Sequence, residues 1–346
     1  MKKYFVCFLA FVLLIGAGSF DVRAQAQDFK TLRDQGVGLY KKGEFRDALD
    51  TLARAARLKE SATDAEFWNY LGLSYLEQDK EKDALKSLEK AVKIAPQTAV
   101  YHANLAFVYL MGRKINKAQA EVEKAIAIDP NSANAYYISG TANLWEGKHE
   151  KAFADAEKAI SVNNKYSPAY VLKADVFIYE FGKGWTEKTP LKENLQWLVK
   201  AKELLETCEK DCARDANFKD AHAKLDTVTA FYEHFKKKAD YENGMPRPAN
   251  TAASNDPNRT PLKIVYRPRP NYTDRARRNN VSGTITLAVV FSADKQISQI
   301  LVLTGLGYGL NEEAIRAAQS IGFEPETENG KPVTVVKTVQ FSFTIY

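Results

Sequence analysis

A spacing of 34 residues recurs along the first two thirds of the chain and restricts its fold more than any other feature. The same interval separates Ala84, Ala118 and Ala152, and again Ala91, Ala125 and Ala159. Apolar residues inside each unit have helical spacing, with a break near Asp79 between two helices. Such a period indicates a repeat array, in which each two-helix unit buries its apolar face against its neighbours.

The best-defined unit has small residues, Gly72, Ala84 and Ala91, where neighbouring helices must approach closely. Its pattern is Trp68-Asn69-Tyr70-Leu71-Gly72-Leu73-Ser74-Tyr75, followed by Ala84, Leu88, Ala91 and Pro96. This pattern resembles the tetratricopeptide repeat (TPR). The resemblance covers residues 30–240 and implies an α-helical TPR solenoid with a concave groove that accepts peptides.

By register, the resemblance places a mixed polar and aromatic set on the groove: Asn69, Leu73, Phe107, Met111, Tyr137, Thr141 and Trp145. The alternative is that these residues pack between repeats, as aromatic residues at helical spacing often do. One subtype of the family clamps a terminal carboxylate with Lys and Asn. Asn104 stands at one suitable position here, but the flanking repeats lack the matching Lys, Asn and Arg.

The period is disturbed after Tyr170, where we expect a degenerate fifth unit. Gly182, Gly184 and Pro190 are expected to break a helix before another begins near Leu191. A last, highly charged helix over residues 222–238 is expected to cover the exposed end of the stack.

A change of composition follows the array. Prolines lie at Pro246, Pro248, Pro257, Pro261, Pro268 and Pro270, among Asn, Ser and Thr. Proline at this density favours an extended, semi-stiff connector. We therefore assign residues 241–262 to a linker and residues 263–346 to a second domain.

The second domain shows strand-like alternation from Gly283 to Phe291 and again over residues 297–303, with a turn at Asp294 between them. Asn311 is the expected N-cap of a following helix. Residues 333–345 alternate again as a last strand, so a small α+β domain with the order β-β-α-β is expected.

The landmarks of this domain are Pro270-Asn271-Tyr272, Gly283-Thr284-Ile285, Leu303-Thr304-Gly305, Leu310-Asn311-Glu312-Glu313-Ala314, Phe323-Glu324-Pro325, Asn329-Gly330-Lys331-Pro332 and Val339-Gln340-Phe341-Ser342-Phe343. They resemble the TonB C-terminal domain, with Thr273 standing where that family usually has proline. The resemblance implies that the last strand offers an edge to an outer-membrane receptor segment, through Val335, Lys337, Val339, Gln340 and Phe341. The alternative is an ordinary strand paired within its own sheet or with a second copy of the domain.

The N-terminus has the layout of a secretory signal peptide. Two lysines precede an apolar stretch from Tyr4 to Phe20, and small residues allow cleavage after Ala24 or Ala26. We assign residues 1–24 to the signal and expect an exported, periplasmic protein. The alternative is an uncleaved inner-membrane anchor, because the apolar stretch is only a little short of the roughly 20 residues that span a bilayer.

The net charge of +6 is modest for 346 residues and argues against nucleic-acid binding. A basic run at Arg267, Arg269, Arg275, Arg277 and Arg278 is either a contact for anionic envelope components or a solvated face. Cys208 and Cys212 would both mature in an oxidising compartment, either as a disulfide or as two free thiols. Nearby histidines do not match a metal-ligand spacing, so no metal or cofactor is expected.

No established catalytic signature occurs, so we expect a non-enzymatic protein with protein or peptide partners. The preferred interpretation is a periplasmic adapter with a peptide groove and a TonB-like domain that engages outer-membrane proteins by strand addition. The alternative is a TonB-like energy transducer for receptor-dependent transport, which requires the uncleaved N-terminal helix.

Overall fold

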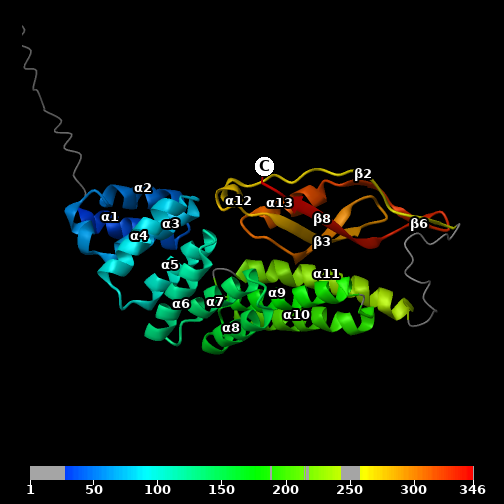
Figure 1. Cartoon of the computed structure of the whole chain (residues 1–346), viewed down its shortest axis with the longest axis horizontal. Helices are drawn as coiled ribbons and strands as arrows, with labels where there is room; N and C mark the ends of the chain where they lie inside the picture. The colour runs from blue at the N-terminus through cyan, green and yellow to red at the C-terminus, as the bar shows by residue number, and fades with distance from the viewer. Residues whose placement is uncertain (1–27, 188, 214, 216–217, 243–257, 346) are drawn as a thin grey trace, which may run out of the picture.

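The computed structural model describes residues 28–345, except residues 188, 214, 216–217 and 243–257. The predicted signal peptide at residues 1–24 therefore lies outside the described residues, as does most of the predicted linker. The described chain forms a curved helical array followed by a sheet-containing domain that lies along the last helices of the array (Figure 1).

Pairs of antiparallel helices build the array, as the 34-residue period predicts. The pairs are α1 (Phe29–Lys41) with α2 (Phe45–Ala55), α3 (Ala65–Glu77) with α4 (Glu81–Ile94), α5 (Ala99–Met111) with α6 (Ile115–Ile128), and α7 (Ala133–Trp145) with α8 (His149–Val162). A short 3-10 helix, η1 (Lys59–Thr63), follows the first pair. Side chains of Asp28, Asp64 and Ser132 accept hydrogen bonds from backbone N–H groups in the first turns of α1, α3 and α7, which fixes where these helices begin.

Small residues hold the helices of one repeat together, as expected from the pattern. A side chain at Gly72 would place its Cβ 2.6 Å from Cγ of Leu88, and one at Gly36 would meet Leu52 at 2.5 Å. Gly38 lies on the same helix as Gly36 but has no atom within 4 Å of a Cβ. The close approach therefore requires glycine at particular positions of the repeat and not along the whole helix.

Three longer helices end the array: α9 (Ser167–Thr186), α10 (Leu191–Asp211) and α11 (Phe218–Glu242). The expected break at Gly182 and Gly184 is wrong, because α9 continues through both glycines. Their lack of a side chain serves packing instead: a Cβ at Gly182 would lie 3.1 Å from Cβ of Leu303, and one at Gly184 would overlap Asn194. The expected helix start at Leu191 is confirmed, with Pro190 as its N-cap.

The last helix, α11, begins before residue 222 and packs on α9 and α10 through Val228, Phe231 and Phe235. It does not simply form a charged cover over the end of the stack, because its other side contacts strand β4 (Ile297–Thr304) of the C-terminal domain. Because α11 has neighbours on two sides, it carries apolar residues on two sides. Its polar and apolar residues are therefore only weakly segregated around the helix.

The C-terminal domain is built on an antiparallel sheet with the order β4-β3-β8, where β3 is Gly283–Phe291 and β8 is Val335–Phe343. Helix α13 (Leu310–Gln319) follows β4, so the predicted order of strand, strand, helix and strand is confirmed for the main sheet. Short elements surround it: β1 (Arg259–Thr260), β2 (Lys263–Tyr266), α12 (Asp274–Arg278), β5 (Gly322–Glu324), β6 (Glu326–Glu328) and β7 (Lys331–Val333).

Several predicted boundaries in this region differ from the structure. Asn311 is not the N-cap of α13: Gly309 takes that position with φ of 77°, and the side-chain oxygen of Asn311 accepts a hydrogen bond from Leu306 N at 2.9 Å. The expected strand 333–345 is divided at Thr334 into β7 and β8, which belong to different sheets. Helix α11 extends to Glu242 and β1 begins at Arg259, so both ends of the 241–262 linker segment contain regular structure.

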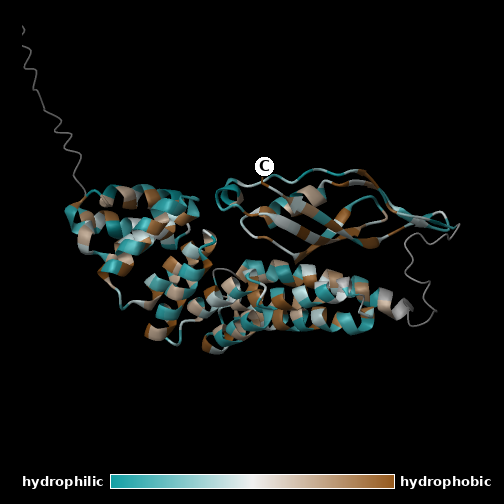
Figure 2. Cartoon of the chain, in the orientation of Figure 1, coloured by the Kyte–Doolittle hydropathy of each residue, from teal (hydrophilic) through white to brown (hydrophobic). Residues whose placement is uncertain are grey.

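The main sheet is buried on both faces. On one face Ile285, Leu287, Val289 and Phe291 pack with α13 in one core, and on the other Ala288, Val290, Leu301 and Leu303 belong to the core of α9, α10 and α11. Figure 1 shows β3 between α13 and α11, and Figure 2 shows hydrophobic residues along both the sheet and these helices. The two domains therefore share one hydrophobic core.

A loop of the C-terminal domain makes a second contact with the array. Gly307, Tyr308 and Gly309 all have positive φ angles, and the Tyr308 hydroxyl donates a hydrogen bond to the carbonyl oxygen of Leu110 on α5 at 3.2 Å. Its ring lies 5.2 Å from that of Trp145 on α7. A left-handed backbone costs a tyrosine roughly 1 kcal/mol, which these contacts offset. Thr273, the departure from the TonB pattern, donates a hydrogen bond to Tyr308 O at 2.7 Å.

Replacing Leu303 with aspartate is expected to separate the two domains, because a charge at this buried position must return to water. Small-angle X-ray scattering should show a larger radius of gyration, with helix content by circular dichroism unchanged. Ser298→Asp, at an exposed position on the same strand, is the matched control and should leave the radius unchanged. Gly182→Val tests the contact from the array side, and an unchanged radius in both interface variants would contradict the shared core.

Candidate functional site

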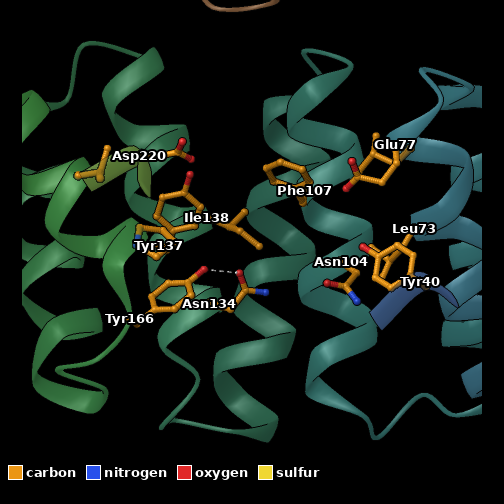
Figure 3. Close-up of a pocket in the computed structure, with 13 residues that line it drawn as sticks. Tyr40, Leu73, Glu77, Asn104, Phe107, Asn134, Tyr137, Ile138, Tyr166 and Asp220 are labelled. Carbon is orange, nitrogen blue, oxygen red and sulfur yellow. Dashed lines mark hydrogen bonds between the residues drawn. The ribbon is translucent and has the colours of Figure 1, made fainter. Parts of the chain in front are cut away.

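The concave side of the array contains an open groove of about 380 Å³. Its lining comes from successive helices of the array and from α11: Tyr40, Leu73, Leu76, Glu77, Asn104, Phe107, Asn134, Tyr137, Ile138, Tyr166, Pro168, Val171 and Asp220. Figure 3 shows these side chains directed into the space between the helices. None of the lining residues belongs to the C-terminal domain, so docking of the sheet leaves the groove open.

The repeat period explains how the lining side chains come together. Leu73 on α3 and Phe107 on α5 occupy the same repeat position, as do Tyr137 on α7 and Val171 on α9. Because consecutive repeats stack in parallel, equivalent positions on their first helices line one continuous surface. The groove is therefore a property of the repeat and not of a single loop.

Three of the residues predicted for the groove, Leu73, Phe107 and Tyr137, line it. Asn69 lies behind them: it is 5% exposed, and its side-chain oxygen accepts a hydrogen bond from Asn104 Nδ2 at 2.8 Å. Trp145 lines a separate space of about 780 Å³ between the domains, next to Tyr308. The last two residues predicted for the groove, Met111 and Thr141, are half-buried on α5 and α7, outside the lining.

Several lining residues were missed by the sequence reasoning. Glu77 stands at the same repeat position as Met111 and Trp145, so the period itself was a sufficient signal for it. Asn134 and Tyr166 follow turns between repeats and are joined by a hydrogen bond from the tyrosine hydroxyl to Asn134 Oδ1 at 3.0 Å. Asp220 had no sequence signal, because α11 lies outside the periodic region and reaches the groove only through its packing on α9.

Burial disfavours ionisation of the groove tyrosines, whose ordinary pKa already keeps them neutral at physiological pH. It raises the pKa of Tyr40 to about 12, and it also raises the pKa values of Tyr137 and Tyr166. These hydroxyls are therefore neutral at physiological pH and act as hydrogen-bonding groups. Loss of solvent around the Glu77 carboxyl, with a smaller effect of Asp79, raises the pKa of Glu77.

The second candidate surface is the outer edge of β8. On its inner edge β8 pairs with β3 from Gly283↔Phe343 to Phe291↔Val335, and none of the described strands pairs with its other edge. Of the predicted edge residues, Val339 and Phe341 are buried in the domain core, Val335 is half-buried, and Gln340 is exposed. Lys337 is exposed and pairs with the buried Glu326 at 3.2 Å.

The basic run partly covers this edge. The Arg267 guanidinium donates a hydrogen bond to the carbonyl oxygen of Gln340 and lies 5.1 Å from the centre of the Phe341 ring. The Gln340 carbonyl therefore points away from β3, and the N–H of the same residue points the same way, since both groups of a strand residue face one side. Arg277 lies over the Tyr272 ring at 5.9 Å, so part of the run serves packing within the domain.

Cys208 and Cys212 are adjacent at the end of α10 and are both free thiols, fully buried. Burial raises the pKa of each thiol, and in Cys208 the neighbouring Cys212 raises it further. Cys212 Sγ lies 3.7 Å from the carbonyl oxygen of Asn164, at the junction with α9. The pair therefore contributes to packing between α9 and α10.

Among the described residues, no group of three or more His, Cys, Asp or Glu side chains is placed to hold a metal ion. Within the same residues, no helix has the length and apolar character needed to cross a bilayer.

Family comparisons confirm the two resemblances. Residues 33–99 match a tetratricopeptide repeat model, and residues 268–345 match the model of the Gram-negative bacterial TonB protein C-terminal domain. The chain thus combines a TPR array with a TonB-type C-terminal domain. No curated protein matches the chain.

Three solved structures are similar to this chain over 53% to 65% of its length. MamA is 25% identical over 53% of this chain and 94% of its own, with a TM-score of 0.41. A thermophilic TPR protein of Thermus thermophilus is 19% identical over 58% of this chain and 99% of its own, with a TM-score of 0.45. PilF of Pseudomonas aeruginosa is 15% identical over 65% of this chain and 94% of its own, with a TM-score of 0.43.

Cys208 and Cys212 are expected to resist alkylation in the native protein, because burial blocks access and the raised pKa values disfavour the reactive thiolate form. Peptide mapping after iodoacetamide treatment checks this. Labelling should become complete when the protein is unfolded without reductant. Labelling only after reductant is added would instead show that the two cysteines form a disulfide, and rapid native labelling would contradict their burial.

Proposed function

We propose that this chain is a periplasmic protein-interaction adapter of the Gram-negative cell envelope. Its TPR groove binds an extended peptide segment of one partner, and its C-terminal domain binds an outer-membrane protein by strand addition. The observation that carries the proposal is the open groove lined by equivalent positions of successive repeats, Leu73 with Phe107 and Tyr137 with Val171. The TPR and TonB-type matches support it, since both are interaction domains without catalytic groups.

Strand addition is supported by the outer edge of β8. A strand placed there would gain backbone hydrogen bonds with alternate residues of β8, Gln340 among them. In the free chain the Gln340 carbonyl oxygen accepts a hydrogen bond from the Arg267 guanidinium, so a partner strand must displace this hydrogen bond. An exposed edge invites pairing with any strand, and Arg267 therefore also limits pairing between copies of this chain.

Gln340→Pro tests strand addition, because proline removes the outward N–H and is tolerated at a strand edge. A photo-crosslinking residue at the exposed Thr338 should form crosslinks to outer-membrane proteins in living cells. The proline variant should reduce these crosslinks severalfold, whereas Gln340→Ala retains the N–H and should not. Crosslinks between two copies of this chain, or crosslinks unaffected by proline, would argue against the proposed partner.

The transducer alternative is tested at the N-terminus, which lies outside the described residues. We expect mass spectrometry of the native protein to find a mature form that begins at Gln25 or Gln27, in the periplasmic fraction. An intact Met1 in the inner-membrane fraction would favour a TonB-like transducer. An intact Met1 in the cytoplasmic fraction would contradict both functions.

A further inference from the structure

The TPR groove has a distinct charge. Its lining contains two carboxylates, Glu77 on α3 and Asp220 on α11, and no lysine, arginine or histidine. Both residues are exposed, and Figure 3 shows them at opposite ends of the groove, with Phe107, Ile138 and Tyr137 between them. The groove therefore presents negative charge at both ends to an occupant.

Nearby cations of the described chain do not neutralise these carboxylates. Lys224 lies one turn after Asp220 on α11, but its ammonium group pairs with Asp175 on α9. Glu77 forms none of the salt bridges found among the described residues. Its pKa is raised, whereas a neighbouring cation would lower it.

Two amide side chains that line the groove, Asn104 and Asn134, each have one hydrogen-bonding atom engaged within the array. Asn104 donates through Nδ2 to Asn69, which leaves its Oδ1 as an acceptor. Asn134 accepts through Oδ1 from Tyr166, which leaves its Nδ2 as a donor. One acceptor and one donor on neighbouring repeats match the N–H and C=O groups of an extended peptide backbone, independently of its sequence.

Aromatic side chains line the groove between the two carboxylates. Phe107 lines the centre of the groove, and the rings of Tyr137 and Tyr166 are packed edge to face at 5.9 Å. Aromatic faces accept the aliphatic stems and charged ends of lysine and arginine, through cation–π contacts that strengthen as water is excluded.

We propose that the groove selects extended peptide segments that carry lysine or arginine at two separated positions. Asn104 and Asn134 bind the peptide backbone, while Glu77 and Asp220 pair with the two basic side chains. This proposal rests on the peptide-binding role proposed above and adds the chemical class of the partner. The selectivity is opposite to that of a groove that clamps a terminal carboxylate, which requires basic residues that this lining lacks.

Binding of three short blocked peptides to the full-length mature chain tests the proposal. One alternates Lys with Ser, one alternates Gln with Ser, and one alternates Glu with Ser. Isothermal titration calorimetry should give an affinity for the Lys peptide about fivefold or more above that for the Gln peptide, since two exposed ion pairs add modest energy. The Glu peptide should bind most weakly, and added salt should reduce the difference between Lys and Gln.

Substitutions separate charge selection from peptide binding itself. Glu77→Gln and Asp220→Asn retain side-chain size and should remove most of the preference for Lys over Gln. Asn104→Ala and Asn134→Ala should weaken the Lys and Gln peptides to the same degree. Glu123→Gln is the matched control, because Glu123 is an exposed carboxylate on α6 outside the groove lining, and it should leave all affinities unchanged.

The proposal of a peptide-binding groove and the proposal of selection for basic peptides would be contradicted by different results. Equal affinity for Lys and Gln peptides, or preference for Glu, with loss of binding in the asparagine variants, would overturn cation selection and leave the peptide groove standing. No measurable binding of any peptide would overturn both. If Glu123→Gln weakens binding of the Lys peptide as much as Glu77→Gln does, the charge effect is diffuse and the assigned site is overturned. Analytical ultracentrifugation tests whether the chain self-associates. If it does, and Glu77→Gln abolishes the self-association, a second copy of the chain occupies the groove and the proposal of a peptide partner is overturned.

Discussion

The second apolar face of the C-terminal sheet is buried against helices α9 and α11, and the remaining architecture depends on this contact. Leu301 and Leu303 on β4 and Val290 on β3 enter a core that also contains Phe231 and Phe235 of α11. Removal of this area from water stabilises the docked arrangement by roughly 25 cal/mol per Å² of apolar surface. Because of this contact, β3 is covered on both faces and α11 lies between the rest of the array and the C-terminal sheet.

Docking also changes how the two candidate surfaces work together. A proline-rich connector alone would leave the groove and the β8 edge as independently moving binding sites, with an effective concentration set by the connector. In the structure, the shared core and the Tyr308 contacts hold them in one geometry. Partners bound at both surfaces must therefore fit a fixed separation and orientation, so geometry and not tether length governs whether both can bind at once.

The chemical character of the groove depends on the side chains at the concave positions of the repeats. Stacking requires small residues such as Gly72 inside each repeat, which leaves the concave positions free to vary. Here those positions carry amides and aromatic rings, with carboxylates at the ends, Glu77 from a regular repeat and Asp220 from α11. In the proposed selection of basic peptides, the final helix of the array supplies one of the two carboxylates and also covers apolar surface.

Local patterns in the sequence were sufficient for the paired helices, the strands β3 and β4, and the groove positions of Leu73, Phe107 and Tyr137. Their signals are helical and alternate-residue spacings within one segment, the spacing of 34 between neighbouring repeats, and, for the groove positions, the register that the TPR resemblance implies. Tertiary structure alone decided the continuation of α9 through Gly182, the position of Asp220 in the groove and the pairing of Trp145 with Tyr308. Each of these depends on a contact between segments far apart in the chain. The effect of a glycine or of a charged side chain at such a position is determined by the residue that packs against it, which the local sequence does not specify.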